Sequence, residues 1–183
     1  SRQDRLKKAQ ERSFKETIWT VPEDRYYQGD THHLVPEVKN HALLPFVEIN
    51  KVSTPEQQIT EFLECNSQYI DWWYKNGDEG MTHYSIPYDS KAKGRSLFYV
   101  DYIIRMKTGQ VFLFDTKSED SDPDAPAKHN ALLLYMEEQN RKGKQLDGGV
   151  LIGQEDLWRY SKFSIENTHD TAGWQPFFPD QYK

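Results

Sequence analysis

The chain has 183 residues, which is the length of one globular domain or of one domain with a tail. Its 29 acidic and 23 basic side chains give a net charge of −6, which excludes a strongly basic protein that coats nucleic acid but leaves room for a local DNA site. The single cysteine, Cys65, excludes an internal disulfide, and the sequence has neither a signal peptide nor an apolar run of about 18 residues. We therefore expect a cytoplasmic protein with no membrane partner.

Residues 1–50 predict a charged lead followed by a connector. The first 17 residues are charged with few apolar positions, and the following stretch mixes aromatic residues with proline and glycine. One edge strand is expected at Phe46–Ile49. The chain begins at Ser1 without a methionine, so we expect these residues to lead in from an upstream region of a larger protein.

The next segment predicts a helix that starts at Ser53-Thr54-Pro55-Glu56. A serine or threonine can cap the helix, proline is tolerated in the first turn, and an acid suits the positive N-terminus. Ile59, Phe62 and Leu63 then recur at helical spacing and predict a buried face.

Several strands are expected after this helix. They are a short aromatic strand closed by the turn dipeptide Asn76-Gly77, a second strand ending near a proline, and, after a basic loop, two hydrophobic runs separated by Lys107-Thr108-Gly109-Gln110. The segments are, in order, Ile70–Tyr74, Thr82–Tyr88, the loop Ser90–Ser96, Leu97–Met106 and Val111–Phe114.

The clearest helix is predicted at Ala127–Asn140, ended by Lys142-Gly143. Gly148–Gly153 is an apolar run bounded by glycines, which is typical of a central and often parallel strand. The order of elements predicts an α/β fold with helices packed on a sheet. We assign residues 51–153 to the core and residues 154–183 to an aromatic-rich tail that packs on it.

The main candidate site is formed by Asp101, Asp115 and Lys117. Side chains two apart on a strand point the same way, so Asp115 and Lys117 share a face. A two-residue turn at Thr108-Gly109 would place Asp101 opposite Thr116, on the wrong face, whereas a three-residue turn at Thr108–Gln110 would place Asp101 opposite Lys117, on the same face. A bulge near Asp101 would have the same effect. Carboxylates with a lysine suit metal-assisted attack of water on a phosphodiester, while the plain alternative is a hairpin with solvated charges.

Other charged residues extend this site. Glu56 is the third acid that we expect near the hairpin, with Glu61 as the alternative; as a plain helix-cap charge Glu56 would have no catalytic role. The basic side chains expected to line a DNA phosphate track are Lys75, Lys91, Lys93, Arg95 and Lys128, which could equally be solvated surface charges. No phosphate-binding loop or dinucleotide motif is present, and the histidines lack zinc spacing with Cys65.

A glutamate opening a helix, an aspartate on a strand and Asp-x-Lys on the next strand resemble the PD-(D/E)XK nuclease superfamily. More narrowly, residues 42–153 resemble the C-terminal nuclease region of type III restriction enzyme Res subunits and related helicase-like proteins. The segments that resemble it are Trp72-Trp73-Tyr74-Lys75-Asn76-Gly77, Ile86-Pro87-Tyr88, Phe98-Tyr99-Val100-Asp101-Tyr102-Ile103-Ile104, Phe114-Asp115-Thr116-Lys117 and Gly148-Gly149-Val150.

The resemblance implies a restriction-endonuclease-like mixed central sheet flanked by helices, and a Mg²⁺-dependent DNA endonuclease in which Mn²⁺ can substitute. Asp101, Asp115, Glu56 and the backbone carbonyl of Thr116 would bind the metal, and Lys117 would orient the attacking water. The chain departs from the family pattern at Val100, where proline is usual, and at Asp115, where glutamate is commoner. The partners implied are double-stranded DNA, an upstream helicase or translocase region of the same polypeptide, and a modification methyltransferase subunit.

Two other functions are compatible with the sequence. A catalytically silent DNA-binding or scaffold domain would keep the fold and bind DNA in a salt-sensitive way without cutting it. A carbohydrate-binding or glycosidase-like domain would need two carboxylates about 5–10 Å apart across a cleft with no lysine between them, and the Asp-x-Lys triplet argues against it.

Overall fold

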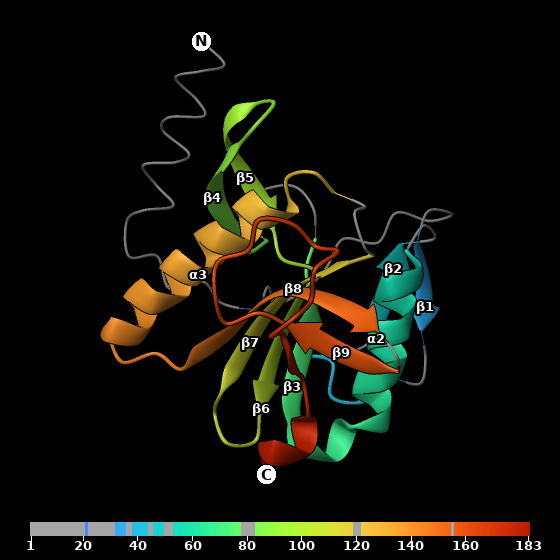
Figure 1. The fold of residues 1–183 in the computed structure, drawn as a ribbon. Helices are drawn as coiled ribbons and strands as arrows, with labels where there is room; N and C mark the ends of the chain where they lie inside the picture. Colours follow the sequence, from blue (N-terminus) through green and yellow to red (C-terminus); the bar gives the residue numbers. More distant parts are fainter. Residues whose placement is uncertain are drawn as a thin grey trace.

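The computed structural model describes residues 21, 32–35, 38–43, 46–49, 53–77, 83–118, 122–154 and 156–183. It is a mixed α/β structure built on a six-stranded sheet in the order β10-β9-β8-β7-β6-β3 (Figure 1). The sheet is mostly antiparallel, and its one parallel pair is β7 with β8. The predicted α/β class is confirmed at this level, whereas the charged lead predicted at residues 1–17 lies outside the described residues.

The strands of the sheet are β3 (Ile70–Lys75), β6 (Tyr102–Met106), β7 (Val111–Lys117), β8 (Leu146–Gln154), β9 (Leu157–Tyr160) and β10 (Gln175–Pro176). Two helices pack on it, α2 (Thr54–Cys65) and α3 (Ala125–Arg141). Separate two-stranded sheets are formed by β1 (His32–Val35) with β2 (Phe46–Ile49) and by β4 (Ser85–Ser90) with β5 (Gly94–Tyr99). Short 3₁₀ turns span Ser67–Tyr69 and Pro179–Gln181.

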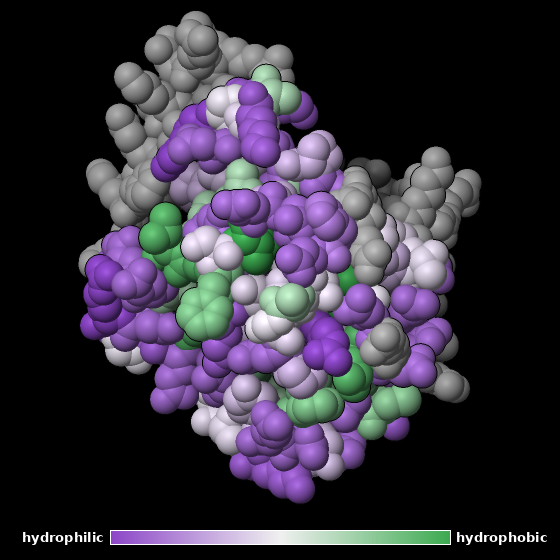
Figure 2. Space-filling view, viewed as in Figure 1, coloured by the Kyte–Doolittle hydropathy of each residue, from purple (hydrophilic) through white to green (hydrophobic). Residues whose placement is uncertain are grey.

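The alternation of side chains along β7 divides the core between the two faces of the sheet. Phe112 and Phe114 point to the face covered by α2, where they pack with Ile59 and the C-terminal Phe177. Leu113 points to the opposite face, which is covered by α3. Strand β7 is therefore buried on both faces, and its polar residues, Asp115, Thr116 and Lys117, follow directly after this buried stretch. The surface seen in Figure 2 is mostly hydrophilic with small hydrophobic areas.

Helix α2 begins where the sequence predicts. Ser53 and Glu56 form a reciprocal capping box, in which the Glu56 N–H donates to Ser53 Oγ (3.4 Å) and the Ser53 N–H donates to Glu56 Oε2 (2.7 Å). Pro55 occupies the first turn, where no intrahelical N–H is needed. The helix buries Ile59 and Leu63 against the sheet.

The predicted single strand Leu97–Met106 is wrong, because the chain bends at Val100 and Asp101. The residues before the bend belong to β5, which pairs with β4, and the residues after it form β6 in the main sheet. The end of β3 holds the bend: the Asn76 N–H donates to the Asp101 carbonyl (2.8 Å), and the Asn76 side chain donates to the Val100 carbonyl (2.9 Å). The predicted basic loop is correspondingly shorter, since only residues 91–93 separate β4 from β5.

The turn between β6 and β7 has three residues, as the functional prediction requires, but it lies one residue earlier than expected. The Gly109 N–H donates to the Met106 carbonyl (2.9 Å), Gly109 has a φ of 90°, and Arg105 pairs with Val111. Continuing this register places Asp101 opposite Asp115 rather than Lys117. Asp101 itself lies at the bend outside β6, and its Oδ2 atom accepts from the Thr116 hydroxyl, so that a face shared by Asp101, Asp115 and Lys117 stays a prediction.

The parallel position predicted for the glycine-rich run is confirmed in β8, which pairs with β7 through Leu113↔Gly148 and Asp115↔Val150. A Cβ atom at Gly148, whose φ is 131°, would lie 2.1 Å from the Leu113 carbonyl oxygen. A Cβ atom at Gly149, whose φ is 144°, would lie 2.5 Å from the His129 ring. Only glycine fits these positions, because both the backbone conformation and the space exclude a side chain.

The C-terminal residues complete the sheet. Strands β9 and β10 extend it beyond β8, and Trp158, Tyr160 and Phe177 belong to the core beneath α2. On the other face, α3 holds the chain that follows β9. Asn130 exchanges two hydrogen bonds with the backbone of Ile165 (3.1 and 2.9 Å), and His129 accepts from the Val150 N–H (3.0 Å).

Candidate metal centre

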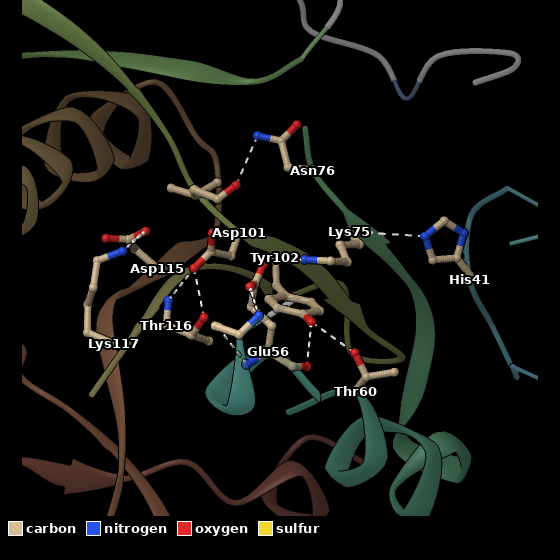
Figure 3. A network of polar contacts seen from close by, with 12 residues as sticks. His41, Glu56, Thr60, Lys75, Asn76, Asp101, Tyr102, Asp115, Thr116 and Lys117 are labelled. Atoms are coloured by element: carbon tan, nitrogen blue, oxygen red, sulfur yellow. Dashed lines mark hydrogen bonds and ion pairs between the residues drawn. The ribbon is translucent and has the colours of Figure 1, made fainter. Parts of the chain in front are cut away.

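Asp115 and Lys117 lie side by side at the C-terminal end of β7, and Asp101 lies at the bend that precedes β6 (Figure 3). Asp115 is only 4% exposed. Its Oδ1 atom accepts a hydrogen bond from Lys117 Nζ at 3.1 Å. Its Oδ2 atom is buried and has no hydrogen-bond partner within the part of the chain that the structure describes. An unpartnered buried carboxylate oxygen is costly, so this oxygen is suited to a ligand.

Asp101 is fixed against the end of β7 by Thr116. Its Oδ2 atom accepts from both the Thr116 N–H and the Thr116 hydroxyl, each at 2.7 Å. The Thr116 side chain faces away from Asp115 and Lys117, as predicted, but its hydroxyl has a role that the sequence did not indicate. Because the N–H and C=O of a strand residue point to the same neighbouring strand, the Thr116 carbonyl also faces the Asp101 side.

The electrostatics of the centre favour a cation. Burial raises the pKa of Asp115 and the negative charge of Asp101 raises it further, whereas Lys117 and Lys128 lower it; the resulting pKa is about 7. Burial lowers the pKa of Lys117, but Asp115 and Asp101 outweigh this effect and raise it overall. At neutral pH Lys117 is therefore charged, and the Asp115 carboxyl group is protonated in part of the molecules and ionised in the rest.

In Figure 3, Glu56 and Asp115 lie on opposite sides of Asp101. Both carboxylate oxygens of Glu56 accept hydrogen bonds. Oε1 accepts from Lys75 Nζ at 2.5 Å and Oε2 accepts from the Ser53 N–H. Burial raises the pKa of Glu56, but Lys75 and Ser53 outweigh it, so that the pKa is lowered overall. Between the two glutamates considered, Glu56 lies near the centre, since the Tyr102 hydroxyl donates to its carbonyl (2.8 Å), whereas Glu61 is exposed.

Lys75 does not lie where a DNA contact was expected. It is 8% exposed, its Nζ atom lies 5.1 Å from the centre of the Tyr102 ring, and its charge is paired with Glu56. The prediction treated Lys75 as a surface residue beside a turn. Instead its position on β3 directs the side chain under α2, where it links the helix to the sheet.

The other predicted DNA contacts lie on the β4–β5 hairpin and at the start of α3. Lys91, Lys93 and Arg95 are exposed on the hairpin, which extends beyond the sheet in Figure 1, although Arg95 also contacts Asp89 at 3.4 Å. Lys128 donates to Asp122 Oδ2 at 2.7 Å and lies near enough to lower the pKa of Asp115. Lys128 is thus paired with Asp122 close to Asp115, and its contact with a DNA phosphate stays a prediction.

Sequence reasoning missed the residue that anchors the hairpin. Asp124, just before α3, accepts from the Ser90 hydroxyl (2.6 Å) and the Tyr88 hydroxyl (3.2 Å). A proline-flanked aspartate before a helix reads as an N-cap, yet its side chain makes no capping bond in the structure. No local signal distinguishes an aspartate that caps its own helix from one that binds a distant strand.

The donor set matches a hard divalent cation with few protein ligands. Among the described residues, no cluster of three or more His, Cys, Asp or Glu side chains is assembled for a metal. Two carboxylates and a backbone carbonyl nonetheless suit Mg²⁺, which is typically bound through one or two carboxylates and retains several waters. Such an ion would bind to the Oδ2 atom of Asp115, which has no hydrogen-bond partner among the described residues.

Comparisons with family models, with curated proteins and with solved structures found no match. Within the described ranges, no helix is long and apolar enough to cross a membrane.

Proposed function

We propose that this chain is a Mg²⁺-dependent DNA endonuclease domain with a restriction-endonuclease-like fold. The observation that carries the proposal is Asp115, a buried carboxylate with one oxygen paired to Lys117 and the other without a hydrogen-bond partner among the described residues. A structural ion pair would satisfy both oxygens. An oxygen left bare beside a second carboxylate and a lysine is better explained by a metal-assisted reaction.

Each residue then has a defined role. Asp101, Asp115 and the Thr116 carbonyl would hold Mg²⁺, which would polarise the phosphate and acidify a bound water. Thr116 keeps Asp101 in place through its N–H and hydroxyl. Lys117, whose pKa is raised, stays protonated and can orient the attacking water or stabilise negative charge on the phosphate. Glu56, with both oxygens engaged, supports the helix next to Asp101 rather than binding the ion directly.

The fold and the charged surface are consistent with a DNA substrate. Helix α2 precedes the antiparallel strands β3, β6 and β7, with the β4–β5 hairpin between β3 and β6, and helix α3 and the parallel strand β8 follow; this order supports the proposal of a mixed sheet flanked by helices. Lys128 lies on the side of Asp115, and Lys91 and Lys93 extend the positive charge along the hairpin. In a larger polypeptide, an upstream translocase region would deliver the duplex, and a methyltransferase subunit would supply recognition of the sequence.

The decisive experiment is cleavage of supercoiled plasmid by the purified chain with Mg²⁺ or Mn²⁺, compared with Asp115→Ala and Lys117→Ala. Asp71→Ala is the matched control, because Asp71 lies on the outermost strand β3, is half-exposed and pairs with Arg105 of β6. Metal-dependent nicking that is lost in the first two variants and kept in the control would support the nuclease. If the parent neither nicks DNA nor binds Mn²⁺ in calorimetry, the proposal fails.

A catalytically silent DNA-binding domain is the second candidate, and the Glu56–Lys75 pair favours it. A lysine that neutralises the third acid removes a metal ligand that an active site of this kind would use. The silent domain predicts DNA binding that weakens with salt, with no effect of Mn²⁺ on either binding or cleavage. The presence or absence of a Mn²⁺ binding heat that depends on Asp115 separates the two functions.

A further inference from the structure

The first turn of α3 lies beside the candidate metal centre. Asp115 and Lys117 point to the face of β7 that α3 covers, because side chains alternate along the strand. Their partners on the neighbouring strand β8 are Val150 and Ile152, and both pack with Ala125, the first residue of α3. The side chains of this turn are therefore placed next to the two charged residues of β7.

Lys128 is the charged residue of this turn, and its amino group is held on two sides. Nζ donates to Asp122 Oδ2 at 2.7 Å and lies 5.8 Å from the centre of the Tyr88 ring. The Lys128 side chain is 19% exposed, and its charge is close enough to lower the pKa of Asp115. Because a free lysine side chain has about 2 kcal/mol of rotamer entropy, these contacts are what keep the amino group in one place.

Asp122, the partner of Lys128, is itself fixed by the backbone that leads into α3. Its Oδ1 atom accepts from the Asp124 N–H at 2.9 Å, and its carbonyl accepts from the Ala125 N–H at 3.0 Å. Burial raises the pKa of Asp122, but Lys128, the Asp124 N–H and Lys117 outweigh this effect, so that the pKa is lowered overall. Asp122 is therefore an ionised and immobile carboxylate, with one oxygen bound to the backbone and the other to Lys128.

Two lysines from different elements thus lie near Asp115. Lys117 approaches from β7 and contacts Asp115 directly, whereas Lys128 approaches from α3 and is paired with Asp122. Within the described part of the chain, each amino group donates to one carboxylate oxygen, and a lysine ammonium has three N–H donors. Both amino groups therefore keep donors for the oxygen atoms of an anion that reaches Asp115.

We propose that Asp122 is a positioning residue, which holds Lys128 beside Asp115 so that its amino group binds a phosphate of the DNA. The inference rests on the proposed endonuclease function, which is what brings DNA to this face. A surface aspartate would ordinarily repel DNA, so the proposal predicts an effect of the opposite sign: loss of the Asp122 charge should weaken DNA binding.

The test measures binding of a short fluorescent DNA duplex to the whole chain by anisotropy, at several salt concentrations and with a chelator present. In Lys128→Gln the affinity should fall about tenfold, because a hydrogen bond between charged groups is lost. The slope of log affinity against log salt should also become shallower by about one, as expected when one phosphate contact is lost. Asp122→Asn should show the same two changes, and Asp122→Glu, which keeps the carboxylate, should retain most of the affinity.

A double variant shows whether Asp122 acts through Lys128. Adding Asp122→Asn to Lys128→Gln should cause no further loss of affinity, because the residue that Asp122 positions is already gone. Glu137→Gln is the matched control, since it also removes one negative charge from an ion pair on α3, with Arg141, and should not weaken binding. Circular dichroism checks that each variant is folded.

Three results would overturn the inference: an unchanged or higher affinity in Asp122→Asn, an equal loss when this change is added to Lys128→Gln, or no binding of the duplex by the parent. The readout does not depend on cleavage. The expected losses of binding without plasmid nicking by the parent would count against the endonuclease alone. Metal-dependent nicking by the parent, with unchanged DNA binding in Asp122→Asn, would count against the role of Asp122 alone.

Discussion

Lys117 Nζ and Asp115 Oδ1 lie 3.1 Å apart, yet this ion pair leaves Asp115 Oδ2 buried without a hydrogen-bond partner among the described residues. The pair is therefore only half satisfied. A fully paired buried carboxylate would have its pKa lowered, whereas burial and Asp101 raise that of Asp115 to about 7.

Metal binding should strengthen as pH rises from 6 to 8. Asp115 must lose its proton to bind a cation, so below its pKa of about 7 the proton and the metal compete. The apparent affinity for Mn²⁺ should fall by up to about tenfold for each pH unit below 7 and level off above it. Isothermal titration calorimetry across this range measures the effect. Asp115→Asn should abolish binding, and a pH-independent affinity in the parent would contradict the prediction.

The metal-free protein should lose stability as pH rises from about 4 to about 7. The pKa of Asp115 is raised by folding, so its contribution is fully present below the unfolded value near 3.8 and is lost as pH rises through the folded value near 7. The loss should be on the order of 1–4 kcal/mol in the free energy of unfolding. Urea unfolding with a chelator at each pH measures it. In Asp115→Asn the decrease should be absent, and an unchanged decrease would assign it to other groups.

Thr116→Val should weaken metal binding without unfolding the protein. The variant removes the hydroxyl that donates to Asp101 Oδ2 but keeps the backbone N–H that donates to the same oxygen. Loss of a group that orients a metal ligand typically costs about tenfold or more in affinity. Thr116→Ser keeps the hydroxyl and is the control. Equal Mn²⁺ affinities for the valine and serine variants would show that the hydroxyl does not position Asp101.

Glu56 and Lys75 should be coupled in stability. Lys75→Met leaves Glu56 half-buried and unpaired and should lower the free energy of unfolding by about 1–3 kcal/mol, less than for a fully buried pair because Glu56 keeps its bond to Ser53. Adding Glu56→Gln to Lys75→Met should cost less than the sum of the two single changes. A double-mutant cycle by urea unfolding measures the coupling. Strict additivity would show that the pair is not a structural unit.

Local signals in the sequence predicted much of the fold. The start of α2 was predictable because its capping box and its apolar face are both written within a dozen residues. The β6–β7 turn was predictable in length because Gly109 marks the position of positive φ. The glycine-rich β8 was predictable as a central strand because its apolar run is continuous.

The errors came from contacts between residues far apart in the chain. The bend at Val100 and Asp101 depends on hydrogen bonds from Asn76, so no property of the run Leu97–Met106 reveals it. Pairing of Lys75 with Glu56 likewise depends on how α2 packs on β3. For the candidate site, the residues Asp101, Asp115 and Lys117 were predicted together and lie together, whereas the hydroxyl of Thr116 and the anchor Asp124 were found only in three dimensions.

The glycine pair at the start of β8 also affects how mutational scans of this chain should be read. Gly148 and Gly149 are not among the candidate metal ligands, but a Cβ atom at either position would collide with Leu113 or with His129. In a scan scored by the proposed nuclease activity alone, both glycines would appear as essential as the candidate ligand Asp115. Protein abundance measured in parallel would separate them, because substitutions at the glycines should deplete the folded protein while Asp115→Asn should not.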